Sequence, residues 1–372
     1  MSGGVDSSVA ACLLREQGYD VVGVFMRLGA DEPVESHPAA AKSDHRSADL
    51  ALPMFGSAGR RSRDRHRGCC SAADSADARA VTGRLGIPFY ALNFAEEFSR
   101  LKRYFSDEYA RARTPNPCVV CNQWLKFGKL LDYADAVEAD WIATGHYARL
   151  DSVHGRPRLR RARDLAKDQS YVLFGVPLGT LRRTLFPLGE LTKGQVRAIA
   201  RRNGLAVHDK PDSQDICFVA DRRYADVVKA FRPDAFSGGT IRHVDGRRLG
   251  AHPGLAHFTV GQRRGLGVAV GTPVYVSRLD AQTNTVFVGP SEAVESFSAS
   301  ASNVQWLVDA PRRPLRAEVR IRYNHVAAPG EVVPVSQGAV RVWFDEPQWA
   351  VTPGQAMVFY RGDEVLGGGW ID

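Results

Sequence analysis

Up to about residue 222, stretches with an apolar face at helical spacing alternate with short apolar runs. An amphipathic helix is expected from about Ser7 to Gly18, and the β-branched run at 20–26 that follows it is typical of a buried parallel strand. Further helices are expected over 73–85, 96–113 and 123–136, and further strands over 87–93 and 140–144. Helices that alternate with strands in this way predict an α/β fold with a doubly wound parallel sheet.

The pattern changes after residue 222, where helical periodicity fades and short alternating stretches follow, such as TPVYVS, TVFVG, RAEVRIRY, AVRVWF and AMVFY. This texture predicts a small linker domain at 223–280 and an all-β barrel at 281–372, after a catalytic α/β domain at 1–222. Within the first domain, residues 28–68 are polar and rich in arginine, which favours a disordered insertion.

The composition is that of an ordinary globular protein, with 44% hydrophobic and 24% charged residues among 372. The chain has neither an apolar run of about 18 residues nor a signal-peptide pattern, so we expect a cytoplasmic protein without a membrane span. Six cysteines are too few for a disulfide scaffold of this length. The net charge of +8 is compatible with a polyanionic partner. Residues 281–372 are slightly acidic, so such a partner is expected to favour the rest of the chain.

A glycine-rich turn runs into the first predicted helix, and its residues are Ser2, Gly3, Gly4, Val5, Asp6 and Ser7. Glycines let the backbone approach a phosphate, whose charge the helix N-terminus binds. The Gly-Lys-Ser/Thr sequence of a Walker A loop is absent. A strand would normally lead into such a loop, but only Met1 precedes it, so we expect the true start of the protein to lie upstream.

Two cysteine-containing segments form the second chemical signal. In TPNPCVVCN, Cys121 is expected at the start of a helix, where the helix dipole would lower the pKa of its thiol. Cys217 lies in DSQDICF, far along the chain. Two such thiols suggest sulfur relay or disulfide chemistry. The alternatives are half of a zinc site for the C-x-x-C pair and simple core packing for Cys217.

The motifs SGGVDSS, TPNPCVVCN, ATGHYAR, KDQSYVL, DSQDICF, GQRRGLG and RIRYNH occur in this order. With them the chain resembles the bacterial tRNA-specific 2-thiouridylases, members of the PP-loop (HUP-like) ATP pyrophosphatase superfamily. The resemblance implies 2-thiolation of the wobble uridine (U34) in tRNAs for Glu, Gln and Lys. It implies that ATP adenylates the C2 oxygen of uridine and that a cysteine persulfide supplies the sulfur. The partners would be tRNA and a persulfide donor, either a cysteine desulfurase or a relay protein.

The same resemblance implies roles for individual residues. Cys121 would be the nucleophile and Cys217 the persulfide carrier. ATP, with Mg²⁺, would bind to Ser2, Gly3, Gly4, Val5, Asp6, Ser7, Met26 and Gly145. The target base would contact Asn116, Pro117 and Cys118. Other tRNA contacts would come from His146, Lys167, Asp168, Gln169, Arg322, Tyr323 and Gln355.

One position departs from the family pattern and leaves an alternative open. Many relatives carry Asp, a proposed acid or base, where this chain has Cys118. Cys118 could take over that role. Alternatively, Cys118, Cys121 and Cys217 could bind an iron–sulfur cluster (4Fe-4S). Two other functions share some of these features: an amidating PP-loop ATP pyrophosphatase and a non-catalytic RNA-binding protein.

Overall fold

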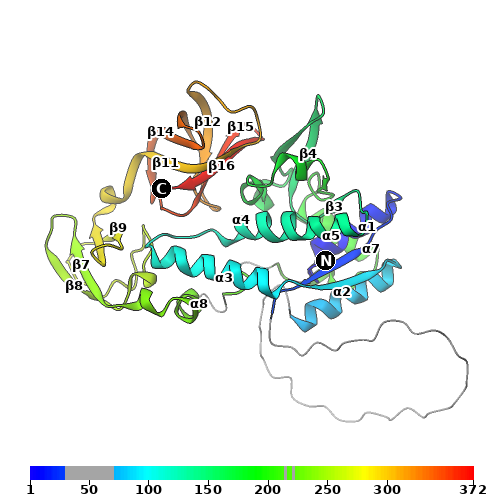
Figure 1. Cartoon of the computed structure of the whole chain (residues 1–372), viewed down its shortest axis with the longest axis horizontal. Coiled ribbons are helices and arrows are strands. Elements are labelled where there is room, and N and C mark those ends of the chain that lie inside the picture. Colours follow the sequence, from blue (N-terminus) through cyan, green and yellow to red (C-terminus); the bar gives the residue numbers. More distant parts are fainter. Residues whose placement is uncertain (30–70, 213–215, 220–222) are drawn as a thin grey trace, which may run out of the picture.

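The computed structural model describes residues 1–29, 71–212, 216–219 and 223–372. Figure 1 shows three regions along the chain: an α/β region that carries the N-terminus, a small sheet region and a C-terminal barrel. The predicted α/β fold with a second small domain and a terminal barrel is confirmed. Most of the predicted insertion at 28–68 lies outside the described residues. Leu28, its predicted first residue, is 4% exposed and buried among apolar side chains.

The α/β region begins with helix α1, whose apolar face packs against α2 and α7 around Val9, Val81 and Val196. Its helices, with α8 of the next region, are α1 (Val5–Glu16), α2 (Ala72–Leu85), α3 (Ala95–Ala110), α4 (Pro117–Cys121), the π-helix η1 (Asn122–Lys129), α5 (Leu130–Ala136), α6 (Leu178–Leu181), α7 (Lys193–Arg202) and α8 (Tyr224–Phe231). Short 3-10 helices are η2 (Leu165–Lys167), η3 (Ser170–Leu173), η4 (Ala206–Asp209), η6 (Pro233–Phe236), η7 (Leu255–His257) and η8 (Ser291–Val294).

The described parallel strands of this region form two separate pairs rather than one continuous sheet. β1 (Gly23–Arg27) pairs with β2 (Phe89–Asn93), and β3 (Ile142–Ala143) pairs with β6 (Thr184–Leu185). The amino group of Met1 donates a hydrogen bond to the carbonyl of Val24 in β1. Met1 therefore lies along the side of β1 that faces away from β2. This is the side on which a further strand of a sheet would pair with β1.

The middle region is a four-stranded sheet in the order β8-β7-β10-β9. Its strands are β7 (Gly239–His243), β8 (Arg248–His252), β9 (Tyr275–Asp280) and β10 (Thr285–Gly289). Its buried face centres on Ile241, Val276 and Val286. Since β10 pairs with both β7 and β9, this sheet extends past residue 280.

The C-terminal region is a closed barrel of six strands in the order β11-β14-β13-β12-β15-β16, because β11 also pairs with β16. The strands are β11 (Glu295–Trp306), β12 (Leu315–Arg320), β13 (Ala328–Ser336), β14 (Ala339–Trp349), β15 (Ala356–Arg361) and β16 (Glu364–Ile371). Closure needs glycine in β16, since a Cβ on Gly367 would lie 2.4 Å from the carbonyl oxygen of Gln305.

The barrel is joined to the α/β region by a hairpin and by a shared core. The hairpin β4 (Ala148–Val153) and β5 (Arg156–Arg161) adds to the edge of β16, and Figure 1 shows it beside the barrel. In the shared core, Val119 and Phe127 lie in one buried cluster with Val358 of β15. No helix among the described residues is long and apolar enough to cross a membrane.

Asp363 in the β15–β16 turn holds this hairpin through ion pairs with Arg149 and Arg160. The hydrogen bond from Arg160 outweighs burial and lowers the pKa of Asp363 below its usual value. A carboxylate with a lowered pKa stabilises the fold above its unfolded pKa, and this contribution is lost as the pH falls through the folded pKa.

We therefore expect Asp363→Asn to destabilise the protein at pH 7 by about 1 kcal/mol or less, since the side chains are partly exposed. Urea unfolding of wild type and variant at pH 7, 5 and 3 tests this. The difference should persist at pH 5 and shrink at pH 3. Glu190→Gln is the matched control, because Glu190 also pairs with Arg149 but is 70% exposed. An equal effect of both substitutions at pH 7 would contradict the prediction.

Candidate active site

The phosphate loop has the backbone shape that its glycines predict. Gly3 has φ +69°, and a Cβ there would lie 2.3 Å from the carbonyl oxygen of Asp74. Gly4 is the N-cap of α1 and supplies no capping side chain. The Oγ of Ser7 accepts a hydrogen bond from the backbone N–H of Ser2 at 3.0 Å. The first turn of α1 therefore offers uncapped N–H groups and the positive end of the helix dipole to an anion.

One lysine joins this loop to the segment that leads to Cys217. The Nζ of Lys193 lies 2.7 and 2.8 Å from the two carboxylate oxygens of Asp6 and 2.8 Å from Asp212. Its side chain is only 13% exposed. The hydroxyl of Tyr147 also donates to Asp6, at 2.7 Å. Burial and the charge of Asp6 together raise the pKa of Tyr147, so it remains a neutral donor.

A second lysine fixes the other side of the loop. The Nζ of Lys210 donates to the carbonyl of Gly3 at 2.9 Å and contacts the carboxylates of Asp74 and Asp77, each at 2.6 Å. Nothing in the local sequence marks Lys193 or Lys210 as site residues, and sequence reasoning missed both. Their partners in and beside the loop, Asp6 and Asp74, lie more than 100 residues away along the chain.

Lys167, predicted to contact tRNA, pairs with Asp212 at 2.8 Å. Asp212 also accepts from Arg197 at 3.1 Å. Burial raises the pKa of Asp212, but hydrogen bonds from Lys167 and Lys193 outweigh this and hold the pKa below its usual value. Asp212 is therefore a stable anion among three cations.

The ends of β1 and β3 carry the residues predicted for adenosine. The backbone of Gly145 packs on the first turn of α1, since a Cβ there would lie 2.7 Å from the amide nitrogen of Ser7. Met26 packs against a buried apolar cluster beneath this end of the sheet. The carboxyl ends of parallel strands are where open α/β folds bind ligands. The positions of Met26 and Gly145 agree with such a pocket.

His146 follows Gly145 and is 7% exposed. Its Nδ1 lies 2.8 Å from the hydroxyl of Thr144, and its Nε2 lies 3.5 Å from the Nζ of Lys126. Burial, helped by the positive charge of Lys126, lowers the pKa of His146 well below 6.5. His146 is therefore neutral at physiological pH, and its predicted contact with tRNA would be that of an uncharged imidazole.

The helix that carries two of the cysteines begins earlier than predicted. Asn116 is its N-cap, with its side-chain oxygen accepting from the N–H of Val119, and Pro117 occupies the first turn. Proline is well suited to this position because its φ is already helical. Cys118 therefore lies in the first turn, and the prediction that Cys121 opens the helix is wrong. Cys121 is the last residue of α4 and leads directly into η1.

The helix widens into a π-helix immediately after Cys121, over Asn122–Lys129. The side chains of Asn122 and Gln123 point away from the helix. They donate hydrogen bonds to the carbonyls of Val172 at 2.9 Å and Gly175 at 3.2 Å, respectively. Gly128 permits the wider turn, because a Cβ there would lie 2.8 Å from the carbonyl oxygen of Gln123. Such π segments are rare and often occur at functional sites.

Three predicted site residues from distant segments pack against the same apolar cluster. This cluster consists of Leu28, Phe94, Phe98, Leu101, Val120 and Leu125. Met26, Cys121 and Cys217 all lie against it. Phe218, next to Cys217, makes edge contacts with Phe98 and Phe105 at 5.5 and 5.1 Å between ring centres. These contacts hold the segment of Cys217 against α3, on the cluster that Cys121 also contacts.

The segment before Cys118 is bound to the barrel. The Nε2 of Gln355 donates to the carbonyls of Thr114 and Pro115 at 3.0 and 3.1 Å. Thr114 donates in turn to the carbonyl of Pro353 at 2.8 Å. Gln355, predicted to contact tRNA, therefore holds the loop of the predicted base contacts.

Tyr323 completes this group from the barrel side. It is 38% exposed, and its ring centre lies 6.1 Å from that of Tyr171. Burial is the largest cause of the raised pKa of Tyr323, and the nearby Cys118 raises this pKa further. Its neighbour Arg322 is half-buried. Of the barrel residues predicted for tRNA, Tyr323 thus lies near Cys118 and Gln355 lies at the loop before the cysteine helix.

Asp168 and Gln169 have internal partners. Asp168 is 4% exposed, and its carboxylate accepts from the backbone N–H of Ala162 at 3.0 Å and from the hydroxyl of Ser170 at 2.9 Å. The side-chain oxygen of Gln169 accepts from the N–H of Tyr147 at 2.9 Å. Both residues hold the turn beside Tyr147, and their predicted contact with tRNA stays a prediction.

Within the described ranges, no three His, Cys, Asp or Glu side chains lie close enough to hold a metal ion. Cys118, Cys121 and Cys217 therefore do not provide the ligand set of an iron–sulfur cluster in this arrangement, and the cluster stays a prediction without support. Mg²⁺ differs, because it binds largely through the phosphates of its nucleotide and one or two carboxylates. Asp6 is a carboxylate in the first turn of α1, and the binding of Mg²⁺ there stays a prediction.

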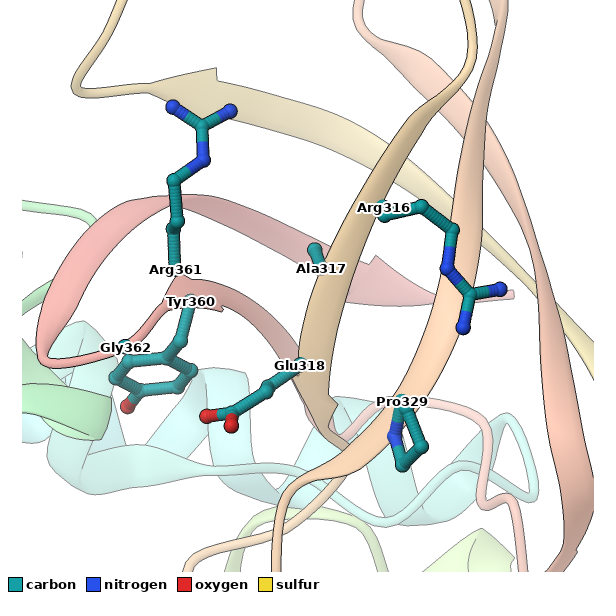
Figure 2. A pocket seen from close by; sticks show the side chains of 7 residues that line it. All are labelled: Arg316, Ala317, Glu318, Pro329, Tyr360, Arg361 and Gly362. Atoms are coloured by element: carbon teal, nitrogen blue, oxygen red, sulfur yellow. The ribbon is translucent and has the colours of Figure 1, made fainter.

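Hollows at the surface of the described chain include one beside the cysteine helix and one on the barrel. One of about 270 Å³ adjoins the cysteine helix and is lined by Tyr104, Glu108, Arg113, Val120, Gln123, Trp124, Ser302, Asn303 and Trp370. The other, of about 230 Å³, lies on the barrel, where Figure 2 shows Glu318 beside Tyr360 with Arg316 and Arg361 farther apart. The barrel hollow contains none of the predicted site residues.

The sequence matches three described protein families in succession. Residues 1–56 and 50–221 match the family described as "tRNA methyl transferase HUP domain". Residues 225–290 match "tRNA methyl transferase PRC-barrel domain", and residues 297–371 match "Aminomethyltransferase beta-barrel domain". The order of these matches follows the three regions of the fold.

Three relatives that match this chain over its full length carry the same name. The chain is 47% identical to the tRNA-specific 2-thiouridylase MnmA of Rhodopirellula baltica, over 100% of this chain and 94% of the relative. It is 46% identical to the protein of that name from Carboxydothermus hydrogenoformans, over 100% and 96%. It is 44% identical to that from Symbiobacterium thermophilum, over 100% and 90%. Identity at this level over the whole length shows that the chain belongs to the tRNA-specific 2-thiouridylase family.

Proposed function

We propose that this chain is an ATP-dependent tRNA sulfurtransferase that converts the wobble uridine (U34) of tRNAs for Glu, Gln and Lys to 2-thiouridine. One observation carries the proposal. Cys121 and Cys217, from segments far apart in the chain, pack against one apolar cluster together with Met26 at the end of β1. Two thiols beside a nucleotide pocket are what an enzyme needs to activate a base and then replace its oxygen with sulfur.

The first step activates the base. The first turn of α1 binds the β- and γ-phosphates of ATP, and Met26 and Gly145 line the adenosine pocket. The C2 oxygen of uridine attacks the α-phosphorus, and the bond from this phosphorus to the bridging oxygen breaks. Pyrophosphate leaves with the electron pair, and the N3 proton of uridine is released. Mg²⁺ bound with ATP neutralises part of the phosphate charge.

The second step transfers sulfur. The outer sulfur of a persulfide on Cys217 attacks C2 of the adenylated base, and AMP leaves with the C2 oxygen. The thiolate of Cys121 then attacks the Sγ of Cys217. This releases 2-thiouridine and forms a Cys121–Cys217 disulfide, which a reductant of the cytoplasm reopens. In a second route, Cys121 attacks the persulfide first and releases hydrosulfide, which attacks C2.

The base must leave its stack to reach these thiols. Asn116, Pro117 and Cys118 form the first turn of the cysteine helix, next to the half-exposed ring of Tyr323. An aromatic ring at this place suits the stacking of an extruded nucleotide. Cys118 is the group available as acid or base for the uracil.

An amidating ATP pyrophosphatase would use the same phosphate loop, but its reaction would give the two packed cysteines no role.

Gly3→Ala tests the phosphate loop. The added Cβ would collide with the carbonyl of Asp74 at a positive φ, so the loop must move. We expect ATP binding, measured by calorimetry, to weaken by at least about 10-fold, since the loop amides no longer converge. Gly18→Ala is the matched control, because Gly18 also has a positive φ, +86°, but open space around it. It should lose stability and keep its ATP affinity, and unchanged ATP affinity in Gly3→Ala would exclude this loop as the phosphate site.

Cysteine variants test the relay. With ATP, Mg²⁺, unmodified glutamate tRNA and a persulfide donor, we expect wild type to form 2-thiouridine, detected by mass spectrometry after RNA digestion. Cys217→Ser and Cys121→Ser should each form less than about 1% of this amount, because no other thiol replaces the lost one. Cys12→Ser should remain active, since Cys12 is buried in another cluster and its pKa is raised to about 11 by burial and Glu16.

Two results would redirect the proposal. If sulfide restored full activity to Cys217→Ser and an iron chelator abolished it, an iron–sulfur mechanism would replace the persulfide relay. If ATP were cleaved without any 2-thiouridine, the amidating function would become the better proposal.

A further inference from the structure

Lys126 is a half-buried lysine that no part of the proposed mechanism uses. It lies in the π-helix η1, and its Nζ is 3.5 Å from the Nε2 of His146. Among the residues that the structure describes, no carboxylate lies within ion-pair distance of it. The other half-buried lysines of this site differ, since Lys167, Lys193 and Lys210 each contact at least one aspartate at 2.8 Å or less.

The neighbour of Lys126 does not neutralise its charge. His146 is buried and hydrogen-bonded to Thr144 through Nδ1, so its Nε2 is available toward the ammonium group as an uncharged partner. A lysine taken partly out of water without an anion carries an electrostatic cost. The amino group of Met1, which also lies near Lys126, is likewise a cation when charged, so no described carboxylate balances the charge of Lys126 and an incoming anion would balance it.

The position of Lys126 indicates which anion this is. His146 follows Gly145, whose backbone packs on the first turn of α1. Lys126 is also on the same continuous helix as Cys121, five residues later. It therefore lies between the phosphate loop and the cysteine helix. In the proposed function, the backbone amides of the phosphate loop bind the β- and γ-phosphates, and the ends of β1 and β3 bind the adenosine. The α-phosphate joins these two parts, and it is the group that the base attacks.

We propose that Lys126 binds the α-phosphate of the nucleotide and acts as a catalytic residue in both chemical steps. This inference rests on the proposed function. In the first step Lys126 stabilises the charge that builds up on the α-phosphate oxygens as the C2 oxygen attacks and pyrophosphate leaves. In the second step it stabilises the phosphate of AMP as AMP leaves with the C2 oxygen. One cation at the shared phosphate serves both steps.

Binding of AMP to the full chain isolates this contact, because AMP has an α-phosphate but no β- or γ-phosphate. Calorimetric titration with AMP and with ATP should show that Lys126→Met weakens both by about 10- to 100-fold, the usual range for a lost charge-assisted hydrogen bond. Lys126→Arg should recover most of the loss. Lys129→Met is the control, since Lys129 lies on the same π-helix but is 54% exposed. Thermal unfolding of each variant reports on folding.

Each outcome decides the inference. Weakened AMP binding with an unchanged melting temperature supports it, even if no 2-thiouridine forms, a result that would overturn the proposed function alone. Weakened ATP binding with normal AMP binding overturns it, since the contact would then be to pyrophosphate. Weakened binding of tRNA alone, with a smaller salt dependence, overturns it in favour of an RNA phosphate. Normal binding of all three, or no AMP binding by wild type, also overturns it.

Discussion

The site depends on how the start of the cysteine helix is fixed. Proline in the first turn of a helix costs no hydrogen bond, because first-turn N–H groups have no partner within the helix, so the direction of this helix is set by the contacts of the loop before it. The barrel sets it here. Gln355 donates to the carbonyls of Thr114 and Pro115, and Arg113 donates to the carbonyl of Ile371 at 2.9 Å. Below these contacts, Val119 shares a buried core with barrel strand β15. The barrel therefore holds the start of the helix that carries Cys118 and Cys121, the residues of the proposed chemistry.

The phosphate loop is held by charge pairing on two sides. Lys210 ties Gly3 to the first turn of α2, and Lys193 ties Asp6 to Asp212, which leads toward the segment of Cys217. Since each of these lysines already has aspartate partners, the loop keeps its shape without a bound nucleotide. A preorganised loop loses little entropy when a phosphate binds. The same pairing connects the predicted phosphate loop to Asp212, near the segment of Cys217, through the half-buried side chain of Lys193.

The sequence predicted those helices and strands whose pattern lies within a short stretch of the chain. The helix of α1, the strands β1 and β2 and most barrel strands follow from apolar spacing and glycine turns. β11 and β16 were missed, because β11 alternates small serine and alanine residues and β16 contains three glycines, two of which (Gly367 and Gly369) its close packing on β11 requires. The phosphate loop and the cysteines could be read from short motifs. Lys193 and Lys210 could not, because their partners Asp6 and Asp74 lie 187 and 136 residues away.

The attachment of the cysteine helix to β16 also orders events during synthesis. Domains fold as the ribosome releases them, N-terminal parts first. Cys118 and Cys121 leave the ribosome early, but Arg113 meets Ile371 only after 258 further residues. Until β16 pairs with β11 and closes the barrel, the helix lacks its outer support. The loop that leads into the helix of Cys118 and Cys121 therefore gains its contact with β16 only when synthesis of the chain is almost complete.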